Sequence, residues 1–94
     1  MDIGFIWDND KYREVQRKHR VQFYEVVSAF DDPNGFGHMG LQGHTERWTW
    51  IGSTTGMRIL AIIYTEEDLP LYRLITAFDA GERLLNDYYR RSRI

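Results

Sequence analysis

Apolar residues recur at helical spacing in the segment 22–30, and this spacing predicts a helix there. The apolar positions lie three or four residues apart, as on one face of a helix: Phe23, Val26, Val27 and Phe30. The helix is expected to end at Asp31-Asp32, because Pro33 disfavours helical backbone at the residue before it.

Two further helices are predicted from their capping residues. Asp8 or Asn9 can accept a hydrogen bond from an unpaired backbone amide and begin a helix over about Lys11–His19. The segment Asp79-Ala80-Gly81-Glu82 has a capping-box spacing and predicts the start of a C-terminal helix. Its buried face would carry Leu84, Leu85 and Tyr88.

The other apolar segments are short, bounded by turn residues, and typical of β-strands. They are Ile3–Trp7, Trp48–Gly52, Arg58–Thr65 and Leu71–Ala77. Short turns at 53–56 and 66–70 predict that the last three strands form an antiparallel meander. The glycine-rich segment 34–46 is predicted to be a loop.

The predicted order is β-α-α-β-β-β-α, which indicates an α+β fold with a small antiparallel sheet and helices packed on one face. A length of 94 residues is consistent with a single domain over 1–94. With 43% hydrophobic residues the chain can form a core. It contains no cysteine, which excludes a disulfide scaffold, a thiolate zinc site and a cysteine nucleophile.

The formal net charge of −2 argues against a protein whose whole surface binds nucleic acid. Basic residues nevertheless gather in residues 11–20 and again in 90–93. These patches either bind a polyanion locally or are solvated helix faces, and charge alone favours solvated faces. Ile59–Tyr64, the longest apolar run, is too short to span a membrane, and no secretory signal follows Met1. A cytoplasmic protein is therefore expected.

The segment Gly35–Gly40 contains the pattern G-x-G-x-x-G, which binds dinucleotides where it follows a strand and begins a helix. Here it follows a helix and precedes a strand, so we expect no such cofactor. His38, His44, Asp31 and Asp32 are near one another in the sequence, but their spacing defines no coordination geometry. We therefore expect no metal site.

Several polar residues are of the types that a metal-free ribonuclease needs: a base, an acid and cations for the phosphate. His19 carries an imidazole, a common general acid and base, within a basic segment, and Arg47 and Arg73 lie on predicted strands that could aim a guanidinium. Each also has a structural interpretation. Arg47 could pair with Glu25 or Glu46, Arg73 could lie beside Tyr64, and His19 could end a helix near its negative dipole end.

Short motifs throughout the chain resemble the BrnT family. They occur in this order: Phe5-Ile6-Trp7-Asp8 with Lys11; Lys18-His19-Arg20-Val21-Gln22-Phe23 with Glu25; Phe30-Asp31-Asp32-Pro33; Glu46-Arg47-Trp48 with Ile51-Gly52; Tyr64-Thr65; Arg73-Leu74-Ile75-Thr76-Ala77; and Glu82 with Tyr88 and Tyr89.

The resemblance implies a RelE-like fold and a ribonuclease toxin of a bacterial type II toxin–antitoxin module. It implies two partners: an RNA substrate, and a BrnA-like antitoxin with a DNA-binding domain. A homodimer or a toxin–antitoxin heterotetramer is then expected. The carried-over site residues are Lys18, His19, Glu25, Arg47 and Arg73. In this hypothesis Arg47 and Lys18 hold the scissile phosphate, while His19 or Glu25 transfers the proton, with no metal or cofactor.

Phe78 departs from the family, whose members commonly have an arginine at this position. Phenylalanine cannot stabilise the charge of a pentavalent phosphate, although its ring could stack on a base. The alternative hypothesis is therefore a catalytically decayed domain of the same fold that binds a partner protein. Its aromatic residues are of a kind enriched in interfaces: Trp48, Trp50, Tyr72, Tyr88 and Tyr89.

Overall fold

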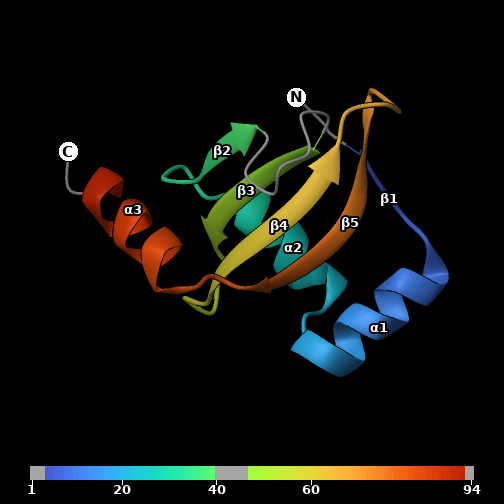
Figure 1. Cartoon of the computed structure of the whole chain (residues 1–94), viewed down its shortest axis with the longest axis horizontal. Coiled ribbons are helices and arrows are strands. Elements are labelled where there is room, and N and C mark those ends of the chain that lie inside the picture. Colours follow the sequence, from blue (N-terminus) through green and yellow to red (C-terminus); the bar gives the residue numbers. More distant parts are fainter. Residues whose placement is uncertain (1–3, 40–46, 93–94) are drawn as a thin grey trace.

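The computed structural model describes residues 4–39 and 47–92, which form a mixed sheet and three helices (Figure 1). The helices are α1 (Asn9–His19), α2 (Phe23–Phe30) and α3 (Glu82–Ser92). The strands are β1 (Gly4–Trp7), β2 (Phe36–Met39), β3 (Arg47–Ser53), β4 (Ile59–Thr65) and β5 (Leu71–Asp79). The α+β class is confirmed, with one strand more than the predicted order.

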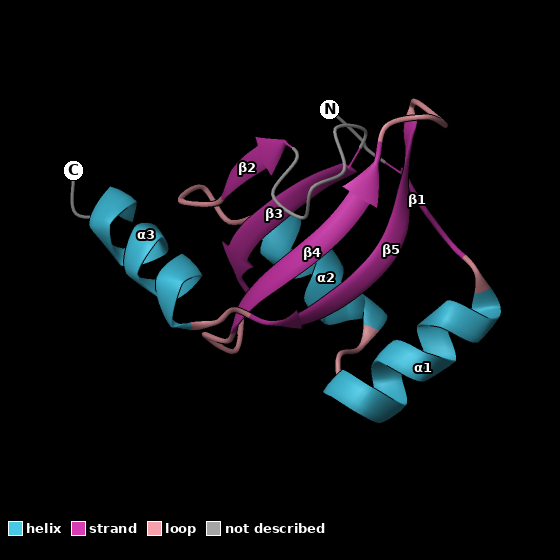
Figure 2. Cartoon of the chain, viewed as in Figure 1, coloured by secondary structure: helices cyan, strands magenta, loops and turns pink. Residues whose placement is uncertain are grey.

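The five strands lie in the order β1-β5-β4-β3-β2 (Figure 2). The predicted antiparallel meander is confirmed for β3, β4 and β5. β1 pairs with β5 in parallel, so the prediction of a purely antiparallel sheet is wrong. A parallel neighbour requires a long connection, and here α1, α2 and three strands separate β1 from β5.

The additional strand, β2, lies within the segment that was predicted to be a loop. It pairs antiparallel with β3, with Phe36 opposite Ile51 and Met39 opposite Trp48. Its four residues have no strand pattern of their own, and they become a strand because the edge of β3 offers backbone partners. Residues 34–35 of the predicted loop precede β2, and its residues 40–46 lie outside the described residues.

The first face of the sheet packs on α2. Leu60, Ile62 and Tyr64 of β4 form one buried cluster with Val26 and Ala29 of α2. The predicted apolar face of residues 22–30 is therefore confirmed in part: Val26 is buried and Phe30 packs partly buried against the cluster, whereas Phe23 is 38% exposed. In the figures α2 lies directly behind β3 and β4 (Figures 1 and 2).

Helix α3 packs on the other side of the sheet, which we call the second face. The indole of Trp50 donates a hydrogen bond to the carbonyl oxygen of Ala29 in α2. Ile51 is the next residue of the strand, and because successive side chains of a strand point to opposite faces, it points away from α2. Ile51 clusters there with Phe36 and with Tyr88 of α3. The prediction that all helices pack on one face is therefore wrong.

Local signals set the helix ends, with one exception. Asp8 caps α1 by accepting hydrogen bonds from the backbone N–H groups of Asp10 and Lys11, as predicted. The predicted role of Asp79 as the cap of α3 is wrong: Asp79 belongs to β5, and its carboxylate binds Arg58. None of the described helices is long and apolar enough to cross a membrane.

Asp32, just after α2, connects the end of that helix to α3. Its Oδ2 atom accepts hydrogen bonds from the Tyr88 hydroxyl at 2.6 Å and from the backbone N–H of Ser53 at 2.7 Å. Partial burial would raise the pKa of Asp32, but these hydrogen bonds and one from the backbone N–H of Asn34 hold it below its usual value. Burial and the bond to Asp32 raise the pKa of Tyr88 to about 12.

Candidate functional site

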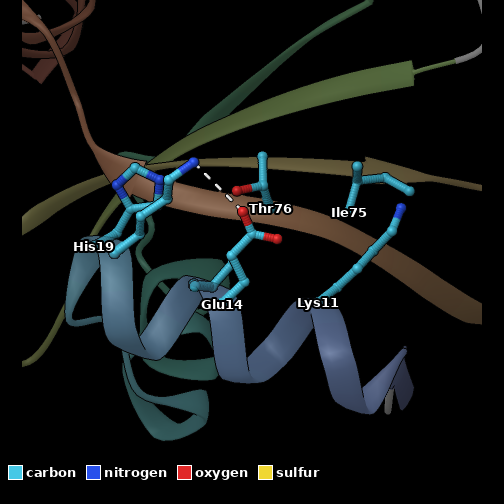
Figure 3. Close-up of a pocket in the computed structure, with 7 residues that line it drawn as sticks. Lys11, Glu14, His19, Ile75 and Thr76 are labelled. Carbon is cyan, nitrogen blue, oxygen red and sulfur yellow. Dashed lines mark ion pairs between the residues drawn. The ribbon is translucent and has the colours of Figure 1, made fainter.

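A cavity of about 220 Å³ lies between α1 and the middle of β5 (Figure 3). Its lining residues are Lys11, Glu14, Val15, Lys18, His19, Ile75 and Thr76. We call it the α1 cavity. The structure thus brings together two of the predicted site residues, Lys18 and His19, with a lysine, a glutamate and a threonine that sequence reasoning did not select.

The helical spacing explains why these α1 side chains share the cavity. The other four α1 residues of the lining follow Lys11 by three, four, seven and eight positions: Glu14, Val15, Lys18 and His19. This spacing places all five on one side of the helix. The edge of β5 is available to α1 because β1 pairs only as far as Leu74. Helix α1 then lies beside the following residues of β5. A sequence search for charged residues at this spacing could have found Lys11 and Glu14.

Lys18 and Glu14 form an ion pair at the mouth of the α1 cavity, with Nζ and Oε1 3.4 Å apart (Figure 3). Both side chains are more than half exposed, so the pair is weak and both groups remain accessible to an incoming ligand. The imidazole of His19 lies 5.9 Å from the ring of Phe78, measured between ring centroids. Phe78 is therefore next to the candidate base.

Arg58 holds the C-terminal end of α1 in place. Its guanidinium donates to the carbonyl oxygens of His19 at 2.7 Å and Arg20 at 2.8 Å. It also pairs with Glu25 at 3.2 Å and with Asp79 at 2.5 Å. The hydrogen bond from Arg58 lowers the pKa of Asp79 despite partial burial. Sequence reasoning missed Arg58 because its partners lie 21 to 39 positions away, and no local motif signals such contacts.

Glu25 has a structural position, apart from the α1 cavity. Its Oε1 atom accepts a hydrogen bond from the backbone N–H of Gln22 at 3.0 Å, which completes the capping box of α2. The side chain is 14% exposed and faces Arg58. Of the two pairings suggested for Arg47, the one with Glu25 is therefore wrong, and Glu46 lies outside the described residues.

Arg47 and Arg73 lie on either side of Thr65 in one row across the second face. Arg47 of β3 is paired in register with Thr65 of β4, and Thr65 is paired with Arg73 of β5. Residues paired in this way point to the same face of an antiparallel sheet. We call these three residues the arginine row. The structure thereby brings together the two predicted arginines, which are 26 positions apart in the sequence.

The two arginines differ in their charge partners. Arg73 pairs with Asp68 of the preceding turn, with Nε and Oδ2 2.6 Å apart, instead of lying free beside Tyr64. No carboxylate of the described residues pairs with Arg47. Among the described residues, the arginine row therefore carries two guanidinium groups and one neutralising carboxylate.

A β-bulge joins the arginine row to the α1 cavity. Ile63 pairs with Thr76 and Thr65 pairs with Arg73, so Ile75 is an additional residue in β5. Because of this extra residue Arg73 and Thr76 share the second face although they are three positions apart. Thr76 also lines the α1 cavity, so this residue belongs both to the cavity and to the face that carries the arginine row.

The described residues contain no group of three histidine, aspartate or glutamate side chains placed to hold a metal ion. His38 lies on β2 with its ring against Phe36, and His44 is outside the described residues. The segment around Gly37 forms β2 and does not begin a helix, so its glycine pattern lacks the geometry of a dinucleotide site.

The comparisons with known proteins agree with the resemblance that the sequence motifs indicated. The model of the family described as "Ribonuclease toxin, BrnT, of type II toxin-antitoxin system" matches residues 7–83. Among solved structures, the Brucella abortus ribonuclease toxin BrnT matches with a TM-score of 0.58 and 22% sequence identity, covering 86% of this chain and 100% of that one. At this identity the match shows the fold alone. No curated protein matches this chain.

Proposed function

The chain belongs to the BrnT family of ribonuclease toxins of type II toxin–antitoxin systems, and we propose that it cleaves RNA without a metal ion at the surface shared by the α1 cavity and the arginine row. The observation that carries this proposal is the bulge at Ile75, which puts Thr76 on the face of Arg73 while it lines the cavity of His19.

Metal-free cleavage of RNA requires a proton acceptor, cations and a proton donor. The 2′-hydroxyl loses its proton and attacks the adjacent phosphorus, and the bond from phosphorus to the 5′-oxygen breaks as that oxygen gains a proton. The products are a 2′,3′-cyclic phosphate and a free 5′-hydroxyl. The negative charge that develops on the phosphoryl oxygens is stabilised by nearby cations.

We assign these roles to the residues that border the shared surface. Arg47 and Lys18 hold the phosphate, and Arg73 joins them when it leaves Asp68. His19 transfers the proton, because imidazole is the side chain that most often serves as a general acid or base. Glu25, the other candidate for the proton, is already bound to the backbone of Gln22 and to Arg58, which favours His19 for this role.

Membership of a toxin–antitoxin family supports the proposal that a BrnA-like antitoxin chain is the protein partner. An RNA substrate and such a partner are consistent with a cytoplasmic protein. A homodimer and a toxin–antitoxin heterotetramer remain the assemblies to be distinguished by mass measurements on the purified complex.

Phe78 favours a second candidate function. An apolar ring, and not a cation, lies next to His19 on the second face. If this surface has lost its chemistry, the domain serves to bind a partner protein without cleaving RNA.

The experiment that separates the two functions is incubation of a long RNA of mixed sequence with purified protein in EDTA. We expect cleavage to leave 2′,3′-cyclic phosphate ends. Arg47→Ala should abolish it without lowering the thermal midpoint. Arg83→Ala, which removes an exposed arginine of α3, is the matched control and should cleave normally. A folded wild-type protein that cleaves no RNA would contradict the enzyme and favour the binding domain.

A further inference from the structure

Thr65 is a buried residue whose hydroxyl is unused. It is 4% exposed, and its Oγ1 atom finds no hydrogen-bond partner within the described part of the chain. Buried polar groups are nearly always paired, because an unpaired hydroxyl loses its contact with water and gains nothing in return. Such a residue is therefore a place to look for a ligand.

A second buried threonine, Thr54, shows what a hydroxyl with a structural role looks like. The hydroxyl of Thr54 accepts hydrogen bonds from the backbone N–H groups of Gly56 at 3.2 Å and Arg58 at 3.1 Å, and so stabilises the turn before β4. Thr65, at the other end of the same strand, stabilises no turn in this way. A valine would fill the same space without leaving an unpaired polar atom.

The neighbours of Thr65 indicate which ligand would use the hydroxyl. Arg47 and Arg73 lie directly across from it on the two adjacent strands. Neighbouring strands are about 4.8 Å apart, so the backbones of the two arginines are roughly 10 Å apart, and their long side chains can meet over Thr65. Two guanidinium groups and a hydroxyl donor together match the oxygens of a phosphate.

We propose that Thr65 is a substrate-binding residue, whose hydroxyl donates a hydrogen bond to a phosphoryl oxygen of RNA held between Arg47 and Arg73. This rests on the proposed function, because it identifies the arginine row as the position of an RNA phosphate. In the protein without bound RNA, the carboxylate of Asp68 forms an ion pair with Arg73. In the proposed complex the phosphate replaces that carboxylate. The site thus consists of two cations and one hydroxyl, all supplied by three adjacent strands.

The first test uses inorganic phosphate as the probe and follows backbone amide resonances of the wild-type protein. We expect the amides of Arg47, Thr65 and Arg73 to shift together as phosphate is added. If none of the three shifts at saturating phosphate, the proposal is overturned. This measurement needs no variant, so a folding defect cannot obscure it.

The second test compares variants at Thr65 in the same titration. Thr65→Val keeps the β-branched shape and removes the hydroxyl, and we expect phosphate affinity to fall about tenfold, the usual effect of losing a hydrogen bond to a charged group. Thr65→Ser should bind nearly as the wild type. Thr49→Val is the matched control, because Thr49 of β3 is also a buried threonine on the second face of the sheet. This variant should leave the phosphate affinity unchanged. Equal affinity in Thr65→Val and the wild type would overturn the role of the hydroxyl.

Asp68→Asn provides a check that does not alter the core. It removes the carboxylate that competes for Arg73, so phosphate should bind several-fold more tightly. Unchanged affinity would contradict a site that includes Arg73.

Cleavage assays on the same variants separate this proposal from the proposed function. If phosphate binding depends on Thr65 but no RNA is cleaved, the phosphate site is supported and the proposed ribonuclease activity is rejected. If Thr65→Val cleaves RNA as the wild type does, the ribonuclease activity is supported and the role of Thr65 is rejected.

Discussion

The guanidinium of Arg58 donates a hydrogen bond to the carbonyl oxygen of His19, with Nη2 and the oxygen 2.7 Å apart. This contact fixes the last residue of α1 relative to the start of β4. It uses the backbone of His19 and leaves the imidazole at the α1 cavity. The position of the candidate base and its chemistry therefore depend on different groups, and can be tested separately.

His19→Gln should remove activity with little effect on folding. The variant keeps the backbone acceptor of Arg58, so we expect the free energy of unfolding to change by less than about 1 kcal/mol. RNA cleavage should fall by at least about 100-fold, as is usual when a general acid–base group is removed. Cleavage rates and thermal midpoints measure the two effects. His38→Gln, outside the α1 cavity, is the control, and near-normal cleavage by His19→Gln would contradict the assignment of the proton transfer.

Arg58→Met should destabilise the protein strongly. It keeps an aliphatic side chain but leaves Glu25, whose side chain is 14% exposed, without its cation. Removing one partner of a largely buried ion pair with several hydrogen bonds should cost about 2–4 kcal/mol, measured by urea unfolding. Arg73→Met is the comparison, because its pair with Asp68 is more exposed and should contribute less to the free energy of unfolding. Equal losses in the two variants would show that the Arg58 contacts contribute little.

Asp32→Asn should change the dependence of stability on acid. Because the folded protein lowers the pKa of Asp32, its ionised form contributes stability above the unfolded pKa of about 3.8. This contribution is lost as the pH falls through the lower, folded pKa. We expect Asp32→Asn to be less stable than the wild type at neutral pH and to approach it near pH 2. Urea unfolding at both pH values tests this, with Asp31→Asn, at an exposed residue, as the control.

Tyr88→Phe should remove part of the alkaline sensitivity. The pKa of Tyr88 is raised from 10.0 to about 12, so its neutral phenol contributes stability that is fully present below pH 10. That stability is lost as the pH rises from about 10 to about 12. We expect the thermal midpoint of the wild type to fall more steeply over this range than that of Tyr88→Phe. Tyr24→Phe, at an exposed tyrosine, should follow the wild type, and parallel curves for all three proteins would refute the prediction.

Gly52→Ala should disturb the contact between β3 and α2. A Cβ atom at this position would lie 2.3 Å from the carbonyl oxygen of Ala29 and 2.6 Å from Nε1 of Trp50. These two atoms form the hydrogen bond between α2 and the indole. We expect a loss of about 1–3 kcal/mol in urea unfolding, as for overpacked cores. Gly56→Ala is the matched control, because its nearest neighbour would be 3.7 Å away; a similar loss there would indicate a general effect of replacing glycine.

The candidate site was predictable only in part. Residue types and the family resemblance selected Lys18, His19, Arg47 and Arg73. The structure places the first two at the α1 cavity and the other two in the arginine row. The same reasoning selected Glu25 on its residue type, while its contacts with Gln22 and Arg58 appear only in three dimensions. Nothing in the local sequence around Thr65 indicates that its hydroxyl is unpaired. Nothing around Arg58 indicates that its guanidinium contacts four other residues.

The sequence by itself determined the elements whose signals are local. The apolar spacing of residues 22–30, the cap at Asp8 and the β-branched segment ending at Thr65 act between residues only a few positions apart, so they can be recognised without a fold. The tertiary structure alone decided the strand status of Phe36–Met39, the parallel pairing of β1 and the bulge at Ile75. Each of these depends on backbone hydrogen bonds to a strand that is distant in sequence, and such partners exist only once the sheet has formed.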